Sequence, residues 1–293
     1  MSNEKNDPSP RLGATGPNAD QIDYWNTEAG AKWVSLQQRL DTQLEMLGQI
    51  PLDALALRAG ERVLDVGCGC GTTTMELARA VGDDGTAVGA DISAVMLERA
   101  RQVARERAVA NVRFENVDAQ SHQFDAAFDA VYSRFGVMFF ADPRAAFANL
   151  RAALAPGGRL AFVCWRGVID NAWMAVPVAA ALEHITIELP TDPHAPGPFA
   201  FADPDHVTGI LDHAGFENIE HHPVDIELAV GGDGDIDEAV AFLMQIGPTA
   251  RVLREADEAT RATVTGAVRK CLEPYATGDG VRMDSGSWLF IAR

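Results

Sequence analysis

The order of apolar and amphipathic segments between Glu61 and Trp165 constrains the fold more than any other feature of this sequence. Short apolar runs alternate there with longer amphipathic segments. The apolar runs cover residues 62–66, 86–90, 112–114, 130–132 and 159–165, and the amphipathic segments cover residues 72–81, 93–108 and 143–154. A chain in which strands alternate with helices forms a parallel sheet with helices on both faces. The pattern therefore predicts an α/β fold with a doubly wound, mostly parallel sheet.

The segments on either side of this alternation add a cap and two more strands. Residues 21–57 carry an apolar stripe at helical spacing, which predicts two or three helices. Residues 219–230 alternate like a strand and residues 287–292 predict a closing strand, so the expected sheet has seven strands. Helical patterns also occur at residues 173–185, 203–214, 236–246 and 255–274.

This order of elements predicts the domain organisation. The first twenty residues are polar, contain several prolines and glycines, and do not resemble a signal peptide, so residues 1–20 are expected to form a flexible tail. Residues 21–57 are expected to form an N-terminal helical cap. The core should span residues 58–293, with substrate-cap insertions near residues 167–215 and 232–275.

A glycine-rich turn directly follows the first predicted strand, in the sequence V-L-D-V-G-C-G-C-G-T over residues 63–72. Glycines let the backbone turn sharply and let a ligand approach the main chain closely. The dinucleotide pattern G-x-G-x-x-G, begun at Gly67, would require glycine where Thr72 stands, and no lysine follows as it does in a P-loop. The turn therefore predicts a ligand site other than a pyrophosphate cradle.

Polar residues stand where three other predicted strands end. Asp91 ends the second strand, Asp118 and Ala119 follow the third, and residues 133–136 follow the fourth. Open α/β sheets bind ligands at the carboxyl ends of their strands, and a carboxylate after the second strand can accept hydrogen bonds from two ribose hydroxyls. Taken singly, these aspartates could also cap a loop, form a turn before Ser93 or simply be exposed. One nucleoside-bearing ligand accounts for all of them together.

As a set, these motifs resemble those of class I S-adenosylmethionine-dependent methyltransferases, and are most similar to the ubiquinone/menaquinone C-methyltransferase type. The resemblance rests on V-L-D-V-G-C-G-C-G, on the aspartate that ends the next strand, on D-A at residues 118–119 and on L-A-P-G-G-R-L before the fifth strand. It covers about residues 24–166. It implies a Rossmann-like fold, S-adenosyl-L-methionine as the cofactor, and an enzyme that transfers a methyl group.

The resemblance also implies a role for each motif residue. The three glycines of the turn would wrap the methionine part of the cofactor, Asp91 would bind the ribose, and Asp118 and the Ala119 N–H would bind the adenine. Other residues would brace the turn or lie beside the methionine part, and Tyr24 would close over it. The implied cofactor-binding set is Tyr24, Asp65, Gly67, Cys68, Gly69, Gly71, Thr74, Asp91, Ile92, Asp118, Ala119, Ser133 and Arg134.

Composition narrows the choice of partners. Acidic residues outnumber basic ones 42 to 24, for a formal net charge of −18, which disfavours a nucleic-acid substrate. No apolar run approaches the roughly 20 residues of a membrane span, so a cytoplasmic protein without membrane insertion is expected. The cysteines form no second cluster, so neither a metal site nor a disulfide framework is expected. They are Cys68, Cys70, Cys164 and Cys271.

A small, largely apolar acceptor, aromatic, quinone-like or lipid-like, is expected, because aromatic and methionine side chains cluster after the fourth and fifth strands. The candidates for its pocket are Phe135, Met138, Phe139, Phe140, Trp165, Trp173, Met174, Phe199 and Phe201. No catalytic residue is assigned, because a sulfonium methyl group is already activated and nothing distinguishes one histidine from another. The histidines considered are His184, His194, His206, His221 and His222.

Two other functions are compatible with parts of the sequence. A non-catalytic S-adenosylmethionine-binding regulator would keep every cofactor residue without a route for an acceptor. A nicotinamide-dependent oxidoreductase would use the same sheet edge, but Thr72 interrupts the fingerprint that it requires. Turnover on any acceptor would exclude the regulator, and preference for a dinucleotide would favour the oxidoreductase.

Overall fold

A computed structural model of the chain describes residues 11–125, 127–186, 192–254 and 256–293. Its sheet has the order β3-β2-β1-β4-β5-β8-β6, with the short strand β7 paired to β8 off this path. The first five strands run parallel, and β8 runs antiparallel between β5 and β6. The strands are β1 (Arg62–Val66), β2 (Thr86–Asp91), β3 (Val112–Asn116), β4 (Phe128–Arg134), β5 (Leu154–Trp165), β6 (Glu220–Ala229), β7 (Ala276–Thr277) and β8 (Gly280–Ala292). The predicted doubly wound, mostly parallel, seven-stranded sheet is confirmed, while β7 was not predicted.

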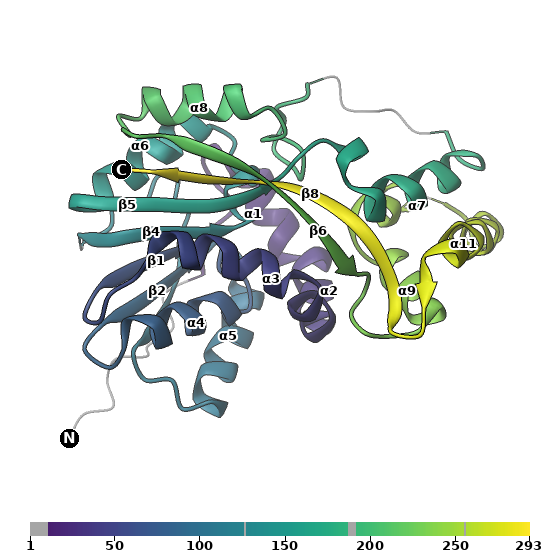
Figure 1. Cartoon of the computed structure of the whole chain (residues 1–293), viewed down its shortest axis with the longest axis horizontal. Coiled ribbons are helices and arrows are strands. Elements are labelled where there is room, and N and C mark those ends of the chain that lie inside the picture. Colours follow the sequence, from purple (N-terminus) through teal and green to yellow (C-terminus); the bar gives the residue numbers. More distant parts are fainter. Residues whose placement is uncertain (1–10, 126, 187–191, 255) are drawn as a thin grey trace.

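Helices cover both faces of the sheet (Figure 1). One face carries α3 (Gln37–Leu55), α4 (Thr72–Val81) and α5 (Ala94–Glu106), and the other carries α6 (Pro143–Ala153) and α8 (Pro204–His213). The helices begin at side-chain caps that the sequence contains: the Ser93 hydroxyl caps α5, and the Asp142 carboxylate caps α6. The apolar side of α6 is fully buried against the sheet, as its spacing predicts.

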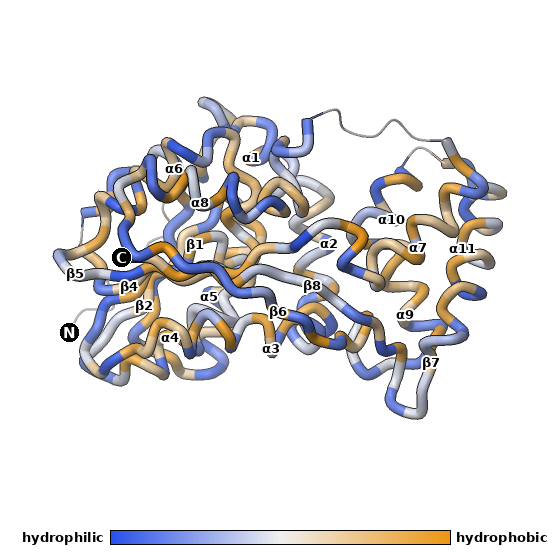
Figure 2. The backbone as a smooth tube through the Cα atoms, turned by 45° about the horizontal axis from the view of Figure 1, so that its top comes forward, coloured by the Kyte–Doolittle hydropathy of each residue, from blue (hydrophilic) through white to orange (hydrophobic). Residues whose placement is uncertain are grey.

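A second group of helices packs beyond one end of the sheet, at the right of Figures 1 and 2. It consists of α7 (Ala172–Leu182), α9 (Ile236–Leu243), α10 (Gly247–Val252) and α11 (Glu258–Leu272). The α7 sequence A-W-M-A-V-P-V-A-A-A-L is apolar on every side, and the helix lies between α11, α10 and β8. In the described ranges, no helix has the length and apolar character that crossing a membrane requires. The sequence pattern missed only α10 of this group, a helix of six residues.

Two strands begin earlier than their sequence patterns predict. Strand β5 starts at Leu154 rather than Arg159, and its pairing with β4 shifts register where the P-G-G segment intervenes. Strand β8 starts at Gly280 rather than Ser287. In its first half, Val281 and Met283 are buried in the core while Arg282 and Asp284 face outward. Because apolar and polar residues alternate there, this half contains no continuous apolar run that would predict a strand.

Candidate functional site

The strand order changes direction between β1 and β4. Open α/β sheets bind ligands at the carboxyl ends of the strands at such a topological switch point. The turns after these two strands touch: a Cβ atom on Gly67 would lie 2.6 Å from the Gly136 Cα atom. The Ser133 hydroxyl joins them as well, donating to the Val66 carbonyl oxygen (2.7 Å) and accepting from the Gly136 N–H (3.2 Å). Ser133 therefore braces the two turns with its hydroxyl group.

The three glycines of the turn differ in how closely other atoms approach them. Gly67, Gly69 and Gly71 have φ values of +70°, +55° and +79°. A Cβ atom on Gly71 would lie 2.8 Å from the Phe114 ring, so this glycine serves packing. The nearest atoms to the position a Cβ would take on Gly69 are the Met96 sulfur at 3.8 Å and the Trp33 indole nitrogen at 4.0 Å. Gly69 is therefore the least crowded of the three, and Trp33 lies over it.

Asp91 ties the end of β2 to this turn. Its Oδ2 atom accepts from the Gly69 N–H at 2.8 Å, and its Oδ1 atom accepts from the Ser93 N–H at 2.7 Å. Burial raises the pKa of the carboxyl group to about 6. The bond to Ser93 is the turn role considered from the sequence, but the bond to Gly69 crosses between two strands. Each oxygen keeps lone pairs that can accept from a ligand hydroxyl.

Asp65 supports the turn from inside the fold. Its Oδ2 atom accepts from the hydroxyls of Thr73 and Thr74, both at 2.7 Å, while its Oδ1 atom has no partner among the described residues. Burial raises the pKa of Asp65 to about 6. Thr74 is fully buried, so its hydroxyl braces the first turn of α4, and Thr73, which the sequence pattern did not single out, does the same. Cys68 is buried in the same turn, and burial raises the pKa of its thiol.

Asp118 and Ala119 lie just beyond β3, in a turn that the chain holds by side-chain hydrogen bonds. Asp118 is only 6% exposed, so it is not merely a surface residue. Its Oδ1 atom accepts from the Asn18 side chain and from the Gln120 N–H, both at 2.9 Å. The Asn149 amide donates to the Ala119 carbonyl oxygen at 2.9 Å. Asn18, 100 residues away in sequence, was not predicted to reach this site.

The N-terminal helices α1 (Ala19–Asn26) and α2 (Glu28–Ser35) cover this edge. The Asn26 amide donates to the Ile92 carbonyl oxygen at 2.8 Å, and the Ser93 hydroxyl donates to the Trp25 carbonyl oxygen at 2.7 Å. Tyr24 is 42% exposed, with its ring against Trp25. Trp33, rather than Tyr24, is the aromatic residue that stands over the glycine turn.

A polar cluster lies beside the turn on the α3 side. The Arg134 guanidinium is 3.5 Å from Asp41 Oδ1, and the other oxygen of Asp41 accepts from the Thr72 hydroxyl at 2.7 Å. The Gln37 side chain reaches the same hydroxyl at 3.5 Å and accepts from Arg99 at 2.9 Å. The cluster thus presents both charge signs, which suits the ammonium and carboxylate of an amino acid. The four-residue spacing of Gln37 and Asp41 on one helix face was the signal available in the sequence.

Rings considered for an acceptor pocket occur in three places. The Phe135 and Trp165 rings stack at 4.0 Å next to the turn after β4, and the Trp173 ring lies 5.4 Å from Trp165. Phe140 and Phe201 pack around Phe147 on the α6 face, and the Phe139 ring lies 5.4 Å from Trp25 of α1.

The histidines considered from the sequence are also dispersed. His194 stacks on His206, and His221 and His222 stand on the outermost strand β6. His184 is exposed just beyond the end of α7.

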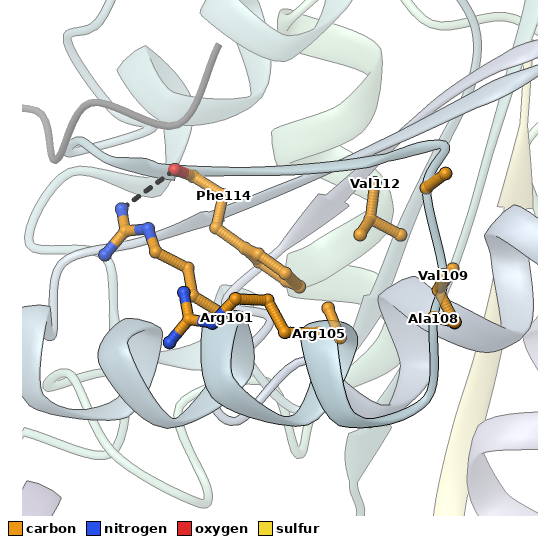
Figure 3. Close-up of a pocket in the computed structure, with 8 residues that line it drawn as sticks. Arg101, Arg105, Ala108, Val109, Val112 and Phe114 are labelled. Atoms are coloured by element: carbon orange, nitrogen blue, oxygen red, sulfur yellow. Dashed lines mark hydrogen bonds between the residues drawn. The ribbon is translucent and has the colours of Figure 1, made fainter. Parts of the chain in front are cut away.

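Other features of the described residues do not coincide with this edge. No group of three His, Cys, Asp or Glu side chains in the described ranges is placed to hold a metal ion. A hollow of about 350 Å³ lies between the end of α5 and the start of β3, at the opposite, amino end of that strand (Figure 3). Arg101 spans it by donating to the Phe114 carbonyl oxygen at 3.0 Å. This hollow is separate from the glycine turn.

Comparison with known proteins gives matches in the same part of the chain. Residues 63–158 match a family model described as a methyltransferase domain. Aklanonic acid methyltransferase DauC of Streptomyces sp. strain C5 is 41% identical over 104 residues, which is 35% of this chain and 47% of that protein. Ubiquinone/menaquinone biosynthesis C-methyltransferase UbiE of Teredinibacter turnerae is 38% identical over 111 residues, which is 37% of this chain and 45% of that protein. The match therefore spans about half the length of these curated relatives.

The whole fold also has solved counterparts. The structure of phosphoethanolamine N-methyltransferase 2 from Haemonchus contortus, determined with S-adenosyl-L-methionine, superimposes with a TM-score of 0.53. The superposition covers 92% of this chain and 59% of that chain, at 16% sequence identity. At this identity the likeness concerns the fold, and it includes the helices outside the matched family domain.

Proposed function

We propose that this chain, which carries a class I S-adenosylmethionine-dependent methyltransferase domain near the ubiquinone/menaquinone C-methyltransferase type, transfers a methyl group to a small, largely apolar acceptor. The observation that carries the proposal is the bond between Asp91 and the Gly69 N–H. It holds a carboxylate at the end of β2 against the glycine turn that follows β1. Neither the sequence matches nor the fold identifies the acceptor.

The residues present fit this cofactor. The glycine turn would hold its methionine part, and Asp41 and Arg134 supply the charges for the ammonium and carboxylate groups. Asp91 would accept from the ribose hydroxyls. Asn18 donates to one oxygen of Asp118, and the Ser121 hydroxyl lies 3.5 Å from the other. That second oxygen would use a remaining lone pair to accept from the adenine amine, with the Ala119 N–H and the Ile92 side chain beside the ring.

Methyl transfer needs two things from the chain: the acceptor atom must be held in position, and water must be excluded from the site. When bound, the cofactor supplies a sulfonium-activated methyl group. The chain would hold the acceptor atom in line with that group and exclude water, and the edge-to-face contacts of Trp25 with Trp33 and Phe139 close the site above. No residue is assigned as a base: His194 and His206 stack on each other, His221 and His222 stand on the outermost strand, and His184 is exposed beyond the end of α7.

The acceptor is proposed to be small and apolar because of the aromatic residues next to the turn after β4. Phe135, which precedes Gly136, stacks on Trp165, and such rings favour a flat apolar molecule. The formal net charge of −18 opposes a nucleic-acid acceptor. DauC is named for aklanonic acid and UbiE for ubiquinone/menaquinone biosynthesis, and the second name supports a quinone-like acceptor here.

Calorimetric titration tests the cofactor half of the proposal. The wild-type protein should bind S-adenosylmethionine and S-adenosylhomocysteine but not NAD, and Asp91→Ala should weaken binding by about 10- to 100-fold, because two charge-assisted hydrogen bonds are lost. Asp84→Ala, an exposed turn residue before β2, is the matched control and should bind normally. NAD binding, or no binding of either sulfur compound, would contradict the proposal. Cofactor binding without methyl transfer to phenols, quinones or amines would favour the non-catalytic regulator.

A further inference from the structure

Two buried side-chain donors near Trp165 have no hydrogen-bond partner among the described residues. They are the indole N–H of Trp173 and the hydroxyl of Ser287. Trp173 is 7% exposed and Ser287 is 0% exposed. A buried donor without an acceptor lowers stability, and buried polar groups in folded proteins almost always have a partner. These two donors therefore require an explanation.

Both donors adjoin the aromatic stack that leads away from the cofactor turn. Ser287 lies directly across from Trp165 in the antiparallel pair of β8 and β5, so their side chains stand on the same face of the sheet. The Trp173 ring lies 5.4 Å from the Trp165 ring, and Trp165 stacks on Phe135. Phe135 immediately precedes Gly136, which touches the glycine turn. A series of neighbouring side chains thus connects the glycine turn to the two donors.

The same strand contains satisfied residues of the same two types. The Ser285 hydroxyl, on the same face of β8 as Ser287, donates to the Ile226 carbonyl oxygen at 2.9 Å. The Trp288 indole N–H donates to the Ala202 carbonyl oxygen at 3.0 Å. The fold therefore provides partners for comparable donors a few residues away, and the unpartnered pair is confined to the face that carries Trp165.

We propose that Trp173 and Ser287 recognise the acceptor, and that the acceptor is a flat ring compound with a neutral carbonyl oxygen that accepts from one or both of them. This inference rests on the proposed methyl transfer. An indole N–H can only donate, so the matching ligand atom must carry a lone pair, which excludes an ammonium group. The stacked rings provide the apolar surface for the ring system. Ring ketones and quinones meet both requirements.

Binding of a matched pair of probes tests the carbonyl. Fluorenone and fluorene share one ring system and differ at the carbonyl, and their affinities can be measured by tryptophan fluorescence with saturating S-adenosylhomocysteine. The wild-type protein should bind fluorenone at least about 3-fold more tightly than fluorene, and Ser287→Ala or Trp173→Phe should each weaken fluorenone binding by about 3- to 10-fold. Ser285→Ala and Trp288→Phe, the matched controls, should keep the wild-type preference. Equal binding of the two probes, binding of neither, or an unchanged preference in both test variants would overturn the proposal.

Thermal unfolding of the ligand-free protein tests the missing partners independently of any probe. Ser287→Ala removes an unpartnered donor and should unfold at the same temperature as the wild type or higher, whereas Ser285→Ala removes a formed hydrogen bond and should unfold at a lower temperature. A decrease for Ser287→Ala as large as that for Ser285→Ala would show a structural partner and overturn the proposal. Normal S-adenosylhomocysteine binding by the Ser287 and Trp173 variants would show that any such failure concerns the acceptor and leaves the proposed methyl transfer intact.

Discussion

The carboxyl edge around the glycine turn and the face around Trp165 treat their buried polar groups differently. At the edge, Asp91, Asp118 and Ser133 all have hydrogen-bond partners within the chain. On the face, the donors of Trp173 and Ser287 have none among the described residues. If the two proposals hold, the cofactor site is assembled before any ligand binds, and a ligand would complete the neighbouring acceptor site. Preorganisation of the first lowers the cost of binding, and the open donors of the second provide selectivity.

Three other buried side-chain atoms lack a partner among the described residues: Asp65 Oδ1, the Gln43 amide nitrogen and the Gln21 amide oxygen. The other oxygen of Asp65 accepts two hydroxyls, and the Gln43 oxygen accepts from the Gly231 N–H. Asp65 and Gln43 are therefore half satisfied, whereas Trp173 has no second polar atom to compensate.

The largest expected effect would test whether the edge is rigid. Gly67→Ala combines a residue at φ +70° with a Cβ atom 2.6 Å from the Gly136 backbone, so it should lower the unfolding free energy by about 3 to 5 kcal/mol and abolish cofactor binding. Gly60→Ala is the matched control, because Gly60 has φ +86° with no atom within 4 Å of the added Cβ. It should cost only about 1 to 2 kcal/mol. Equal losses in urea unfolding would mean that the two turns separate easily.

A smaller effect on the unfolding free energy is expected from Asp65, whose Oδ1 atom is the unpartnered atom in the carboxyl group that supports the glycine turn. Burial raises the pKa of Asp65 from 3.8 to about 6, so the folded protein holds this proton more tightly than the unfolded chain. The resulting stabilisation is complete below pH 3.8 and is lost as the pH rises through 6, by about 3 kcal/mol for a shift of about two units. The unfolding free energy of the wild type minus that of Asp65→Asn should therefore fall by about 3 kcal/mol between pH 4 and pH 7. If this difference in unfolding free energy, measured by denaturant titration, did not change with pH, Asp65 would be ionised throughout the range. The carboxyl edge would then hold no unusually bound proton.

The smallest effect concerns Phe135, which joins the two regions. Phe135 has φ +62°, a conformation that favours glycine, while its ring stacks on Trp165. Phe135→Ala and Phe135→Gly both remove the stack, but glycine should be the more stable replacement by about 1 kcal/mol. Ala108→Gly, at φ +52° away from both regions, should gain a similar amount. If Phe135→Gly were less stable than Phe135→Ala, the backbone at residue 135 would not be strained, and Phe135 would connect the two regions by ring packing alone.

Much of the candidate site followed from local sequence patterns, and the rest depended on distant contacts. Gly67 and Asp91 could be placed because a turn and a strand end are defined by their neighbours in sequence. Asn18 and Asp41 could not, because they reach the site from helices whose packing no local pattern specifies. The closing role of Tyr24 stays a prediction: its ring contacts Trp25 and Arg254, while Trp33 is the aromatic residue found next to Gly69.

The sequence by itself determined the alternating strands and helices, the glycine turn and the carboxylates at the strand ends. These features are local, since they depend on side-chain periodicity and on turn chemistry within a few residues. Only the tertiary structure decided which polar groups are satisfied. Ser285 and Ser287 are two residues apart on one strand, yet among the described residues only the Ser285 hydroxyl has an acceptor, the Ile226 carbonyl oxygen. Ile226 lies 59 residues away on β6, so the packed fold and not the local sequence supplies this partner.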